Sequence, residues 1–271
     1  MKRDVLSSLQ NEPSLSTHAS RRRFISTLGG VLGSTLLFGC SPLPSIDFFT
    51  QIEIEPDRSR LFIARARHGA YRARVVTAKD VTGNAFARVD EILKKTRADM
   101  CVNGSFFEED GSPSGLLIIG GKVENPFITG KGDGVLHIDR EGQIHLAAMD
   151  YNLLVRFLKD PSDFTHALQC NLLSRNGDIL YRWWKKEPAR LVPRNLIGIS
   201  EWGVVDVIAK DTNFILGDQY MREVHRCHTV AALDGGGSAA GIDRWGNRSK
   251  NEIMDEKNEG RVPNFLIFEM I

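Results

Sequence analysis

The stretch TVAALDGGGS, from Thr229 to Ser238, carries the strongest local signal in the sequence. Its first five residues form an apolar run that predicts a buried strand, and the carboxylate of Asp234 follows directly at the strand end. Gly235, Gly236 and Gly237 have no Cβ atom, so their backbone N–H groups can approach a ligand and form a concave anion site. Because three consecutive glycines cost conformational entropy on folding, this pattern favours a functional loop over a plain connector.

Strand-like runs recur along the chain, and turn residues such as Arg140–Gln143 and Asn176–Asp178 join some of them as hairpins. Helical periodicity is limited to Ala85–Arg97 and the shorter candidates Asn152–Lys159 and Asp218–Arg226. The expected strands are Gln51–Glu55, Leu61–Arg67, Arg72–Thr77, Asp99–Val102, Leu116–Ile119, Val135–Ile138, Ile144–Ala148, Leu196–Ser200, Val204–Ala209, Thr229–Leu233 and Asn264–Met270. The sequence therefore predicts an α+β fold, a single domain with a large, mostly antiparallel or mixed β-sheet and a few flanking helices.

The composition is that of a globular protein. The 271 residues include 35 Lys and Arg against 34 Asp and Glu, with 42% hydrophobic residues. A net charge of +1 argues against a dedicated nucleic-acid binder, which needs basic residues to neutralise phosphates. Residues 1–39 hold five basic and two acidic side chains, which leaves 30 basic and 32 acidic for the other 232 residues. A basic head on a neutral body is a targeting pattern.

The N-terminal segment has the features of an export signal. Ser20–Ser26 (SRRRFIS) resembles the twin-arginine motif, and the apolar run of 16 residues from Phe24 to Gly39 is shorter than the ~20 residues of a membrane-spanning helix. The run ends in LFGC, which resembles a lipobox and makes Cys40 the expected lipidation site. We therefore expect a signal peptide at 1–39, a lipidated Cys and tether at 40–50, and one domain at 51–271. The alternative is a plain signal peptide cleaved near residue 40, which leaves a free thiol.

Two further motifs are weak signals alone but become candidate site residues when considered together with the Asp234 loop. Asn103-Gly104-Ser105-Phe106-Phe107 follows a predicted strand, and the Asn103 amide offers both donors and an acceptor, although Asn-Gly alone is usually just a turn. Arg194, in Pro193-Arg194-Asn195-Leu196-Ile197-Gly198, could bind a phosphate bidentately from the start of a strand. Alone, it would be read as a solvated surface residue.

In this order, the three motifs resemble the phosphodiester glycosidase family, which shows N-G-G/S-F-F, P-R-T-x-[IV]-G and N-L-D-G-G-G-S. The family's intervening glycine and G-K turn correspond to Gly115 and to Gly121-Lys122. The resemblance covers about residues 60–271. Three positions depart from the family pattern: Ala232 stands for Asn, Asn195 for Thr, and Gln169-Cys170-Asn171 for a Q-x-G-P-like step.

The resemblance implies hydrolysis of a sugar-1-phosphodiester bond. Together with the N-terminal signal, it predicts an exported, lipid-anchored hydrolase that acts on cell-surface glycans in the cell envelope, and that is periplasmic or anchored to the outer membrane if the source is Gram-negative. It assigns Asp234 the stabilisation of an oxocarbenium ion or the activation of water, and Asn103 the orientation of water or phosphate. The expected substrate-binding residues are Arg194, Gly235, Gly236, Gly237, Ser238 and Ser105. The candidates for a second carboxylate are Glu108, Glu109, Asp133 and Asp243.

Several alternatives remain open at this point. The chain could be a non-catalytic glycan-binding lipoprotein that assists exopolysaccharide assembly or export, or a phosphodiesterase that cuts the P–O bond. No cofactor is certain, but a divalent cation such as Ca²⁺ or Mg²⁺ could bind through Asp234, since phosphate sites often use one. Cys101, Cys170 and Cys227 are expected to be buried apolar residues, and His225-Arg226-Cys227-His228 is expected to be a helix end more than a zinc site.

Overall fold

The computed structural model describes residues 48–54, 60–150, 164–180, 191–249 and 261–271, with single positions at 152, 153, 155 and 159. Residues 46–271 form one compact unit. The predicted signal peptide, the lipidation site Cys40 and most of the tether lie outside the described residues, as does most of the expected helix Asn152–Lys159. No helix of the described part is both long and apolar enough to cross a membrane.

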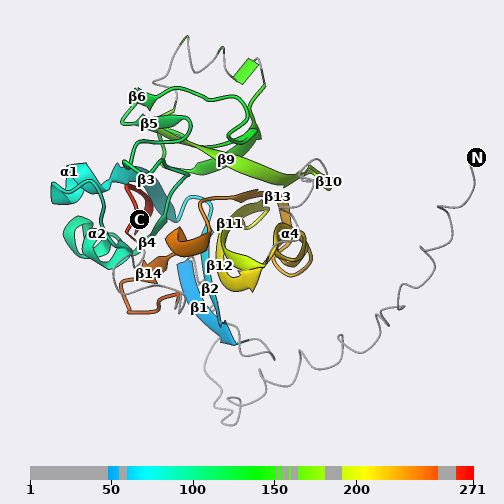
Figure 1. Cartoon of the computed structure of the whole chain (residues 1–271). Coiled ribbons are helices and arrows are strands. Elements are labelled where there is room, and N and C mark those ends of the chain that lie inside the picture. Colours follow the sequence, from blue (N-terminus) through cyan, green and yellow to red (C-terminus); the bar gives the residue numbers. More distant parts are fainter. Residues whose placement is uncertain are drawn as a thin grey trace, which may run out of the picture. The chain divides into compact units, whose positions relative to one another are not determined.

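A large antiparallel sheet of eleven strands dominates the described chain (Figure 1). Its main path is β1 (Phe48–Ile54), β2 (Arg60–Arg67), β12 (Gly203–Thr212), β11 (Val192–Ser200), β13 (Cys227–Ala232), β9 (His166–Arg175), β5 (Leu117–Ile119) and β6 (Lys122–Asn125). Off this path, β7 (Gly134–Ile138) and β10 (Asp178–Ile179) pair with β9, and β8 (Ile144–Ala148) pairs with β7. The long strand β9 therefore joins the β13 side of the sheet to its β5–β8 side.

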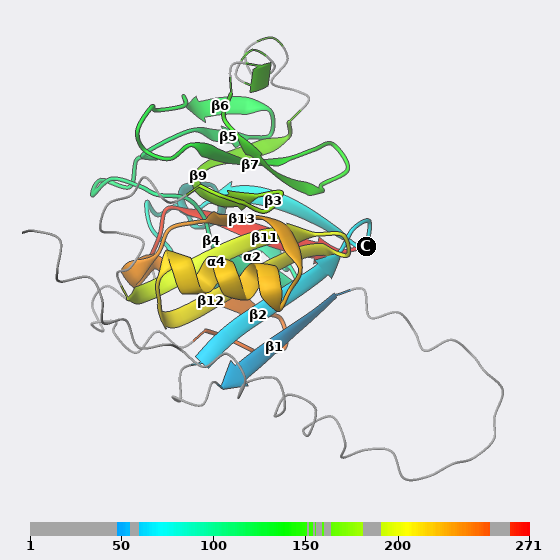
Figure 2. The ribbon, with the colours of Figure 1, turned by 90° about the vertical axis from the view of Figure 1, so that its right-hand side faces the viewer.

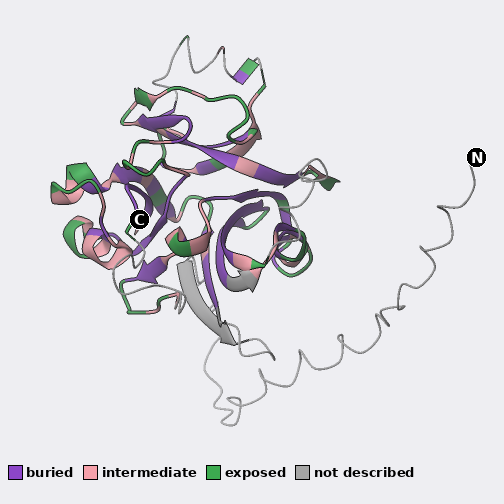
Figure 3. Ribbon diagram, viewed as in Figure 1, coloured by how far each residue is buried: buried purple, intermediate pink, exposed green. Residues whose placement is uncertain are grey.

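A smaller antiparallel sheet has the order β14 (Gly241–Asp243), β4 (Met100–Asn103), β15 (Asn264–Met270) and β3 (Tyr71–Thr77). The largest core cluster contains side chains of both sheets, among them Phe62 and Ile197 from the large sheet and Leu266 and Phe268 from the small one. Burial of this apolar surface, at roughly 25 cal/mol per Å², is the main force that holds the two sheets together. In Figure 3, the strands of both sheets are largely buried.

The helices cover the outer faces of these sheets. α1 (Ala78–Thr82) and α2 (Val89–Thr96) lie at the small sheet, where Ile92 packs in one cluster with Cys101 and Ile267 (Figure 1). α4 (Phe214–Glu223) packs on the large sheet through Phe214 and Met221. Its first turn is capped by Asn213, whose side chain accepts a hydrogen bond of 2.8 Å from the Leu216 N–H.

The α+β prediction is confirmed, and each of the eleven expected strands overlaps a strand of the structure. The helix boundaries differ. α2 begins at Val89 because Ala87 forms a bridge with Val262, and α4 begins four residues before the expected Asp218. The three expected cysteines are buried and free, and burial raises the pKa of Cys170 and of Cys227 to about 12.

Candidate active site

Asp234 lies where the two sheets meet at one end of their strands. β13 ends at Ala232, and the next residue continues the pairing because the Leu233 N–H donates to the Asn195 carbonyl at 3.0 Å. The Asp234 N–H then donates to the carbonyl of Gly104 at 3.1 Å. The backbone of Asp234 is therefore fixed between strand β11 and the loop that follows β4.

The Asp234 carboxyl group is held in a partly apolar setting. Burial raises its pKa to about 6, although hydrogen bonds from the Ser238 side chain and the Gly235 N–H lower it in part. The Gly235 N–H lies 2.9 Å from the carboxylate oxygen Oδ1. A carboxyl group that titrates near neutral pH can exchange a proton during a reaction, which is the property that a general acid or base requires.

The glycine loop forms a short 3-10 helix over Gly236–Ser238. A Cβ atom on Gly235 would lie 2.9 Å from the Pro193 carbonyl oxygen, and Gly236 has a φ of +60°, so both positions favour glycine. The Gly235 N–H is engaged by the Asp234 carboxylate and the Ser238 N–H by the Gly235 carbonyl. Of the predicted anion-binding loop, Gly237 is the exposed member.

Asn103, at the end of β4, is fully buried and does not border the solvent. Its Nδ2 donates to the Asp234 carbonyl at 2.8 Å and to the Gly104 carbonyl at 3.4 Å. Its Oδ1 accepts from Asn195 Nδ2 at 2.9 Å and from the Ala240 N–H at 3.0 Å. These bonds use both donors and both acceptor positions of the amide, so the structure favours a positioning role over the predicted orientation of water or phosphate.

Ser105 is also buried, and its backbone is bonded to β15. The Ser105 N–H donates to Asn264 Oδ1 at 2.7 Å, and Gly104 leaves no space for a Cβ atom because that atom would lie 2.0 Å from the same oxygen. Asn264 therefore fixes the loop that supports Asp234. Sequence reasoning missed this residue, because an Asn at the start of a predicted strand gives no functional signal.

Arg194 lies on β11 beside the Asp234 loop. The register pairs Leu196 with Ala232, which places Arg194 and Asp234 at facing positions just beyond the paired residues. The guanidinium carbon lies 3.8 Å from the ring centroid of Phe214, and the side chain is 7% exposed. The Arg194 side chain is therefore buried against the first residue of α4 and is not the solvated surface residue that the motif alone would suggest.

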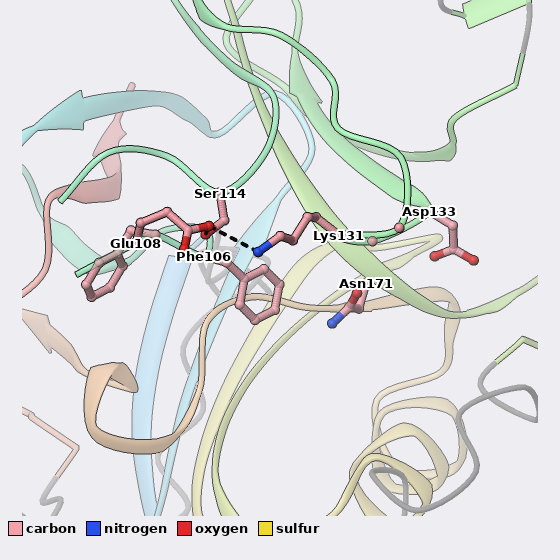
Figure 4. Close-up of a pocket in the computed structure, with 9 residues that line it drawn as sticks. Phe106, Glu108, Ser114, Lys131, Asp133 and Asn171 are labelled. Carbon is pink, nitrogen blue, oxygen red and sulfur yellow. Dashed lines mark hydrogen bonds and ion pairs between the residues drawn. The ribbon is translucent and has the colours of Figure 1, made fainter. Parts of the chain in front are cut away.

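A cavity of about 520 Å³ adjoins this strand end (Figure 4). Asn171 connects the two, because it lines the cavity and pairs in register with Ala232 of β13. The residues that line it are Phe106, Phe107, Glu108, Ser114, Gly130, Lys131, Gly132, Asp133 and Asn171. Figure 4 shows Lys131 directed toward Glu108, with Asn171 and Asp133 on the other side of Lys131.

The polar side chains of the cavity form a small network. Lys131 Nζ lies 3.1 Å from Glu108 Oε1, and Ser114 Oγ donates to the same oxygen at 2.6 Å. These bonds, first that of Ser114 and then that of Lys131, lower the pKa of Glu108. The cavity therefore presents one cation, Lys131, beside an ionised carboxylate and an aromatic ring.

Gln169 supports the loop that carries Lys131. Its Nε2 donates to the carbonyls of Ile128 and Gly132 at 2.7 and 2.9 Å, and its Oε1 accepts from the N–H groups of Leu116 and Ile128 at 2.8 and 3.1 Å. This fully used, buried amide ties the 128–132 segment to β9. The sequence pattern drew attention to Gln169 but gave no signal for Lys131.

The four candidates for a second carboxylate differ in their distance from the cavity. Glu109 is exposed and does not line it. Glu108 and Asp133 line the cavity, whereas Asp243 holds a turn at the other end of β14 by accepting from the backbone N–H groups of Trp245 and Asn247 at 2.9 and 2.8 Å.

Among the described residues, no group of three His, Cys, Asp or Glu side chains could hold a metal ion. The segment His225–His228 is not the helix end that the sequence predicts, because α4 ends at Glu223 and Cys227 and His228 begin β13. His225 is contacted by Arg65 and His228 by Thr229.

Two antiparallel sheets around a shared core define an α+β protein with an acidic glycine loop at one end of the strands. Asp234 does not line the cavity itself, whose wall carries Glu108, Lys131 and Asp133. The match of residues 96–269 to the phosphodiester glycosidase (NAGPA) family model shows that the chain belongs to this family. Among curated proteins, no sequence matches the chain significantly.

Solved structures share the fold. The zebrafish N-acetylglucosamine-1-phosphodiester alpha-N-acetylglucosaminidase catalytic domain, auto-inhibited by its pro-peptide, is similar with a TM-score of 0.59 and 13% identity, over 82% of each chain. A protein of Synechocystis gives a TM-score of 0.56 at 10% identity, over 82% of this chain and 61% of that one. A protein of Burkholderia pseudomallei K96243 gives 0.50 at 12% identity, over 78% and 74%.

Proposed function

We propose that the protein is an exported hydrolase that cleaves sugar-1-phosphodiester bonds of cell-surface glycans, with Asp234 as the central catalytic residue. The observation that carries this proposal is the Asp234 carboxyl group, whose pKa burial raises to about 6. It lies two residues beyond Ala232, which pairs with Asn171 on the wall of the cavity of about 520 Å³. Family membership supplies the reaction class. The zebrafish enzyme's name supports N-acetylglucosamine-1-phosphodiesters as the first substrates to test.

The chemistry suits a site with one prominent carboxyl group. A phosphate monoester is already a good leaving group, so the C1–O bond can break without the strong general acid that an alkyl glycoside needs. As this bond breaks, positive charge develops at C1, and the ionised Asp234 stabilises it or accepts a proton from the attacking water. Water supplies the new oxygen at C1, and the bond electrons leave with the phosphate.

The charge of the phosphate requires cations and N–H donors nearby. Lys131 supplies a cation on the cavity wall, and Arg194 supplies a second one beside the Asp234 loop. The exposed Gly237 is the member of the glycine loop best placed to approach a ligand. We assign the sugar to the part of the cavity near Phe106, because aromatic rings stack on sugar faces.

Export and anchoring rest on the sequence before β1. The twin-arginine-like motif and the lipobox-like LFGC support transport to the cell envelope and lipidation of Cys40. Radiolabelled palmitate incorporation into the full chain, compared with the Cys40→Ser variant, tests this part separately. Label in both chains would contradict lipidation at Cys40.

Product analysis tests the reaction. The full chain is incubated with UDP-GlcNAc and with a GlcNAc-1-phospho-sugar diester, with and without Ca²⁺ or Mg²⁺. We expect free GlcNAc from the wild type and none from Asp234→Asn, while Asp178→Asn, an exposed carboxylate on β10, retains activity. Circular dichroism shows whether each variant is folded.

Each other outcome assigns a different function. GlcNAc-1-phosphate in place of free GlcNAc would show P–O cleavage, and the glycosidase proposal would be wrong. Binding of phosphoglycans without any product would favour the non-catalytic lipoprotein. Full activity in a folded Asp234→Asn variant would remove Asp234 from the mechanism.

A further inference from the structure

The antiparallel sheets have two ends, and Asp234 lies at only one of them. At the other end lie the turns after β2, β11 and α2, the turn after β14, and the last residues of β15. We call this the distal end, defined by residues Arg67, His68, Arg97, Trp202, Arg244, Trp245 and Met270. Hydrogen bonds join its parts, since the His68 N–H donates to the Trp202 carbonyl at 3.2 Å and the Arg244 N–H to the Asp99 carbonyl at 2.9 Å.

The distal end exposes large apolar side chains. Trp245 is 53% exposed, Trp202 37% and Met270 36%, and they come from three different elements. A single exposed apolar residue needs no explanation, but two exposed tryptophans on turns at the same end of a molecule indicate a surface that contacts something. Tryptophan combines an apolar ring with a polar N–H group and therefore favours the boundary between water and lipid.

The position of Trp245 is fixed by its surroundings. The Asp243 carboxylate accepts a hydrogen bond of 2.9 Å from the backbone N–H of Trp245 and one of 2.7 Å from Asn247 Nδ2. These two bonds fix the turn. The Arg244 guanidinium lies 4.5 Å from the Trp245 ring centroid and forms an ion pair with Asp99. The other Asp99 oxygen accepts from the backbone N–H of Met270 at 2.6 Å. The buried Asp99 carboxylate therefore contacts both the backbone of Met270 and the arginine that stacks on Trp245.

Cations surround these apolar residues. Arg67, His68, Arg97 and Arg244 are exposed, and Glu201 is the exposed acidic residue on the same turns. Glu269, which precedes Met270, is paired with Arg74, and Arg244 is paired with Asp99. The exposed charged side chains of the distal end are therefore mostly basic. Each Lys or Arg near an anionic lipid surface contributes about 1 kcal/mol of attraction.

The chain also enters the domain at this end. Phe48, the first residue of β1, pairs with Ala66 of β2, next to Arg67. Figure 2 shows the start of β1 on the same side as the C-terminus. Cys40 precedes Phe48 by eight residues, which span at most about 28 Å when extended.

We propose that the distal end is a membrane-docking surface that rests on an anionic phospholipid bilayer. Trp202 and Trp245 lie at the level of the headgroups, and Arg67 and Arg97 contact their phosphates. The cavity and Asp234 then face away from this bilayer, toward polymers outside it. The inference rests on exposure, charge and the position of β1, and it does not depend on the hydrolase assignment.

Site-specific fluorescence tests this orientation in the full chain. Cys40→Ser removes the Cys40 thiol, while Cys101, Cys170 and Cys227 are buried and are expected to react slowly. An environment-sensitive fluorophore is attached to Trp245→Cys, or to Val123→Cys as a control that is equally exposed on β6. Vesicles of phosphatidylcholine with phosphatidylglycerol then serve as the membrane.

We expect the fluorophore to brighten at position 245 and to stay unchanged at position 123. Replacement of Arg67 and Arg97 by Ser and Asn in the Trp245→Cys chain removes two cations, and each is expected to weaken the response about five-fold. Pure phosphatidylcholine vesicles should give the same weak response. Asp234→Asn should leave all signals unaltered, so that failure of the proposed hydrolysis is distinguished from failure of docking.

Three results would overturn the proposal. Brightening at position 123 alone would show that another face contacts the bilayer, and equal brightening at both positions would show nonspecific adsorption. The absence of brightening at both positions would show that the domain stands away from the membrane, as it would if the distal end bound a protein partner.

Discussion

Asn103 Nδ2 lies 2.8 Å from the carbonyl oxygen of Asp234, and this hydrogen bond joins a strand of the small sheet to the Asp234 loop of the large one. The same amide accepts from Asn195 Nδ2, which follows Arg194 in the sequence. The two motifs that the sequence places 131 residues apart are thus connected through one buried side chain. Asn103 is a positioning residue because it acts through the Asp234 backbone.

Asn103→Ala is expected to lower both stability and kcat. The change leaves the Ala240 N–H and the Asp234 carbonyl without this partner, which costs about 1–3 kcal/mol for each buried group left unsatisfied. Asn195 Nδ2 keeps its bond of 3.3 Å to the backbone carbonyl of residue 103. Urea unfolding measures the loss. Asn103→Asp keeps the acceptor but not the donor to Asp234, so we expect a lower kcat with little change in KM. A lower affinity with unchanged kcat would instead indicate direct contact with the substrate.

The pH dependence of kcat/KM should report the Asp234 pKa. If the ionised carboxylate is the active form, activity rises with pH through about 6, where the folded protein releases this proton. The Ser238 hydrogen bond lowers this pKa, so Ser238→Ala is expected to move the rising limb to higher pH. Ser112→Ala, at an exposed turn, should leave it in place. A limb that falls through the same pH would assign Asp234 the role of an acid.

The sequence predicts the strands whose apolar residues alternate or cluster, and it misses those that carry polar residues into the core. β9 is the main example, because Gln169 and Ser174 interrupt its apolar pattern yet are buried at 1% and 0% exposure. Gln169 is polar because it ties a loop to the strand, and Ser174 donates to Asp218 at 2.5 Å. Such positions are defined by partners that are distant in sequence, which local patterns cannot show.

In the candidate site too, the residues that a local sequence pattern reveals differ from those whose role depends on distant partners. Asp234 and the glycine loop can be recognised from the sequence because the pattern is local and costly to keep. Lys131 and Asn264 could not be recognised, since their importance comes from their positions beside the cavity and beneath Ser105. The sequence motifs singled out Asn103 and Arg194, but they gave no sign that both side chains are buried.

Lys131→Met is expected to weaken the binding of phosphodiester substrates. Lys131 and Glu108 are each 51% exposed, so their ion pair adds little to stability and the variant should fold normally. Loss of one cation from the cavity should raise KM about ten-fold with little change in kcat, by analogy with hydrogen bonds to charged groups that contribute 1.5–3 kcal/mol. Lys122→Met removes a similar exposed Lys–Glu pair on β6 and serves as the control. Equal effects of both changes would show that only net charge matters.

Asp206, on β12, has no described hydrogen-bond partner for either oxygen and is 1% exposed between Ile197 and Ala64. Burial raises the pKa of Asp206 well above its usual range, so the folded protein keeps this proton to a higher pH than the unfolded chain does. The unfolded chain releases this proton above pH ~4, and stability therefore falls as pH rises from there toward the folded pKa. Asp206→Val removes this dependence and an unpaired polar group, and should raise the free energy of unfolding at pH 7 by about 1–3 kcal/mol.

Urea unfolding of wild type and variant at pH 5 and pH 8 measures this effect, and the gain of Asp206→Val should be larger at pH 8. Asp206→Asn is the matched control, because it removes the titratable carboxyl group but still buries an unpaired polar group. It should abolish the pH dependence with a smaller gain in stability. If Asp206→Val is instead less stable than wild type at pH 8 while Asp206→Asn is not, the Asp206 carboxyl group makes a favourable polar contact in the folded protein, and its burial is not a net cost.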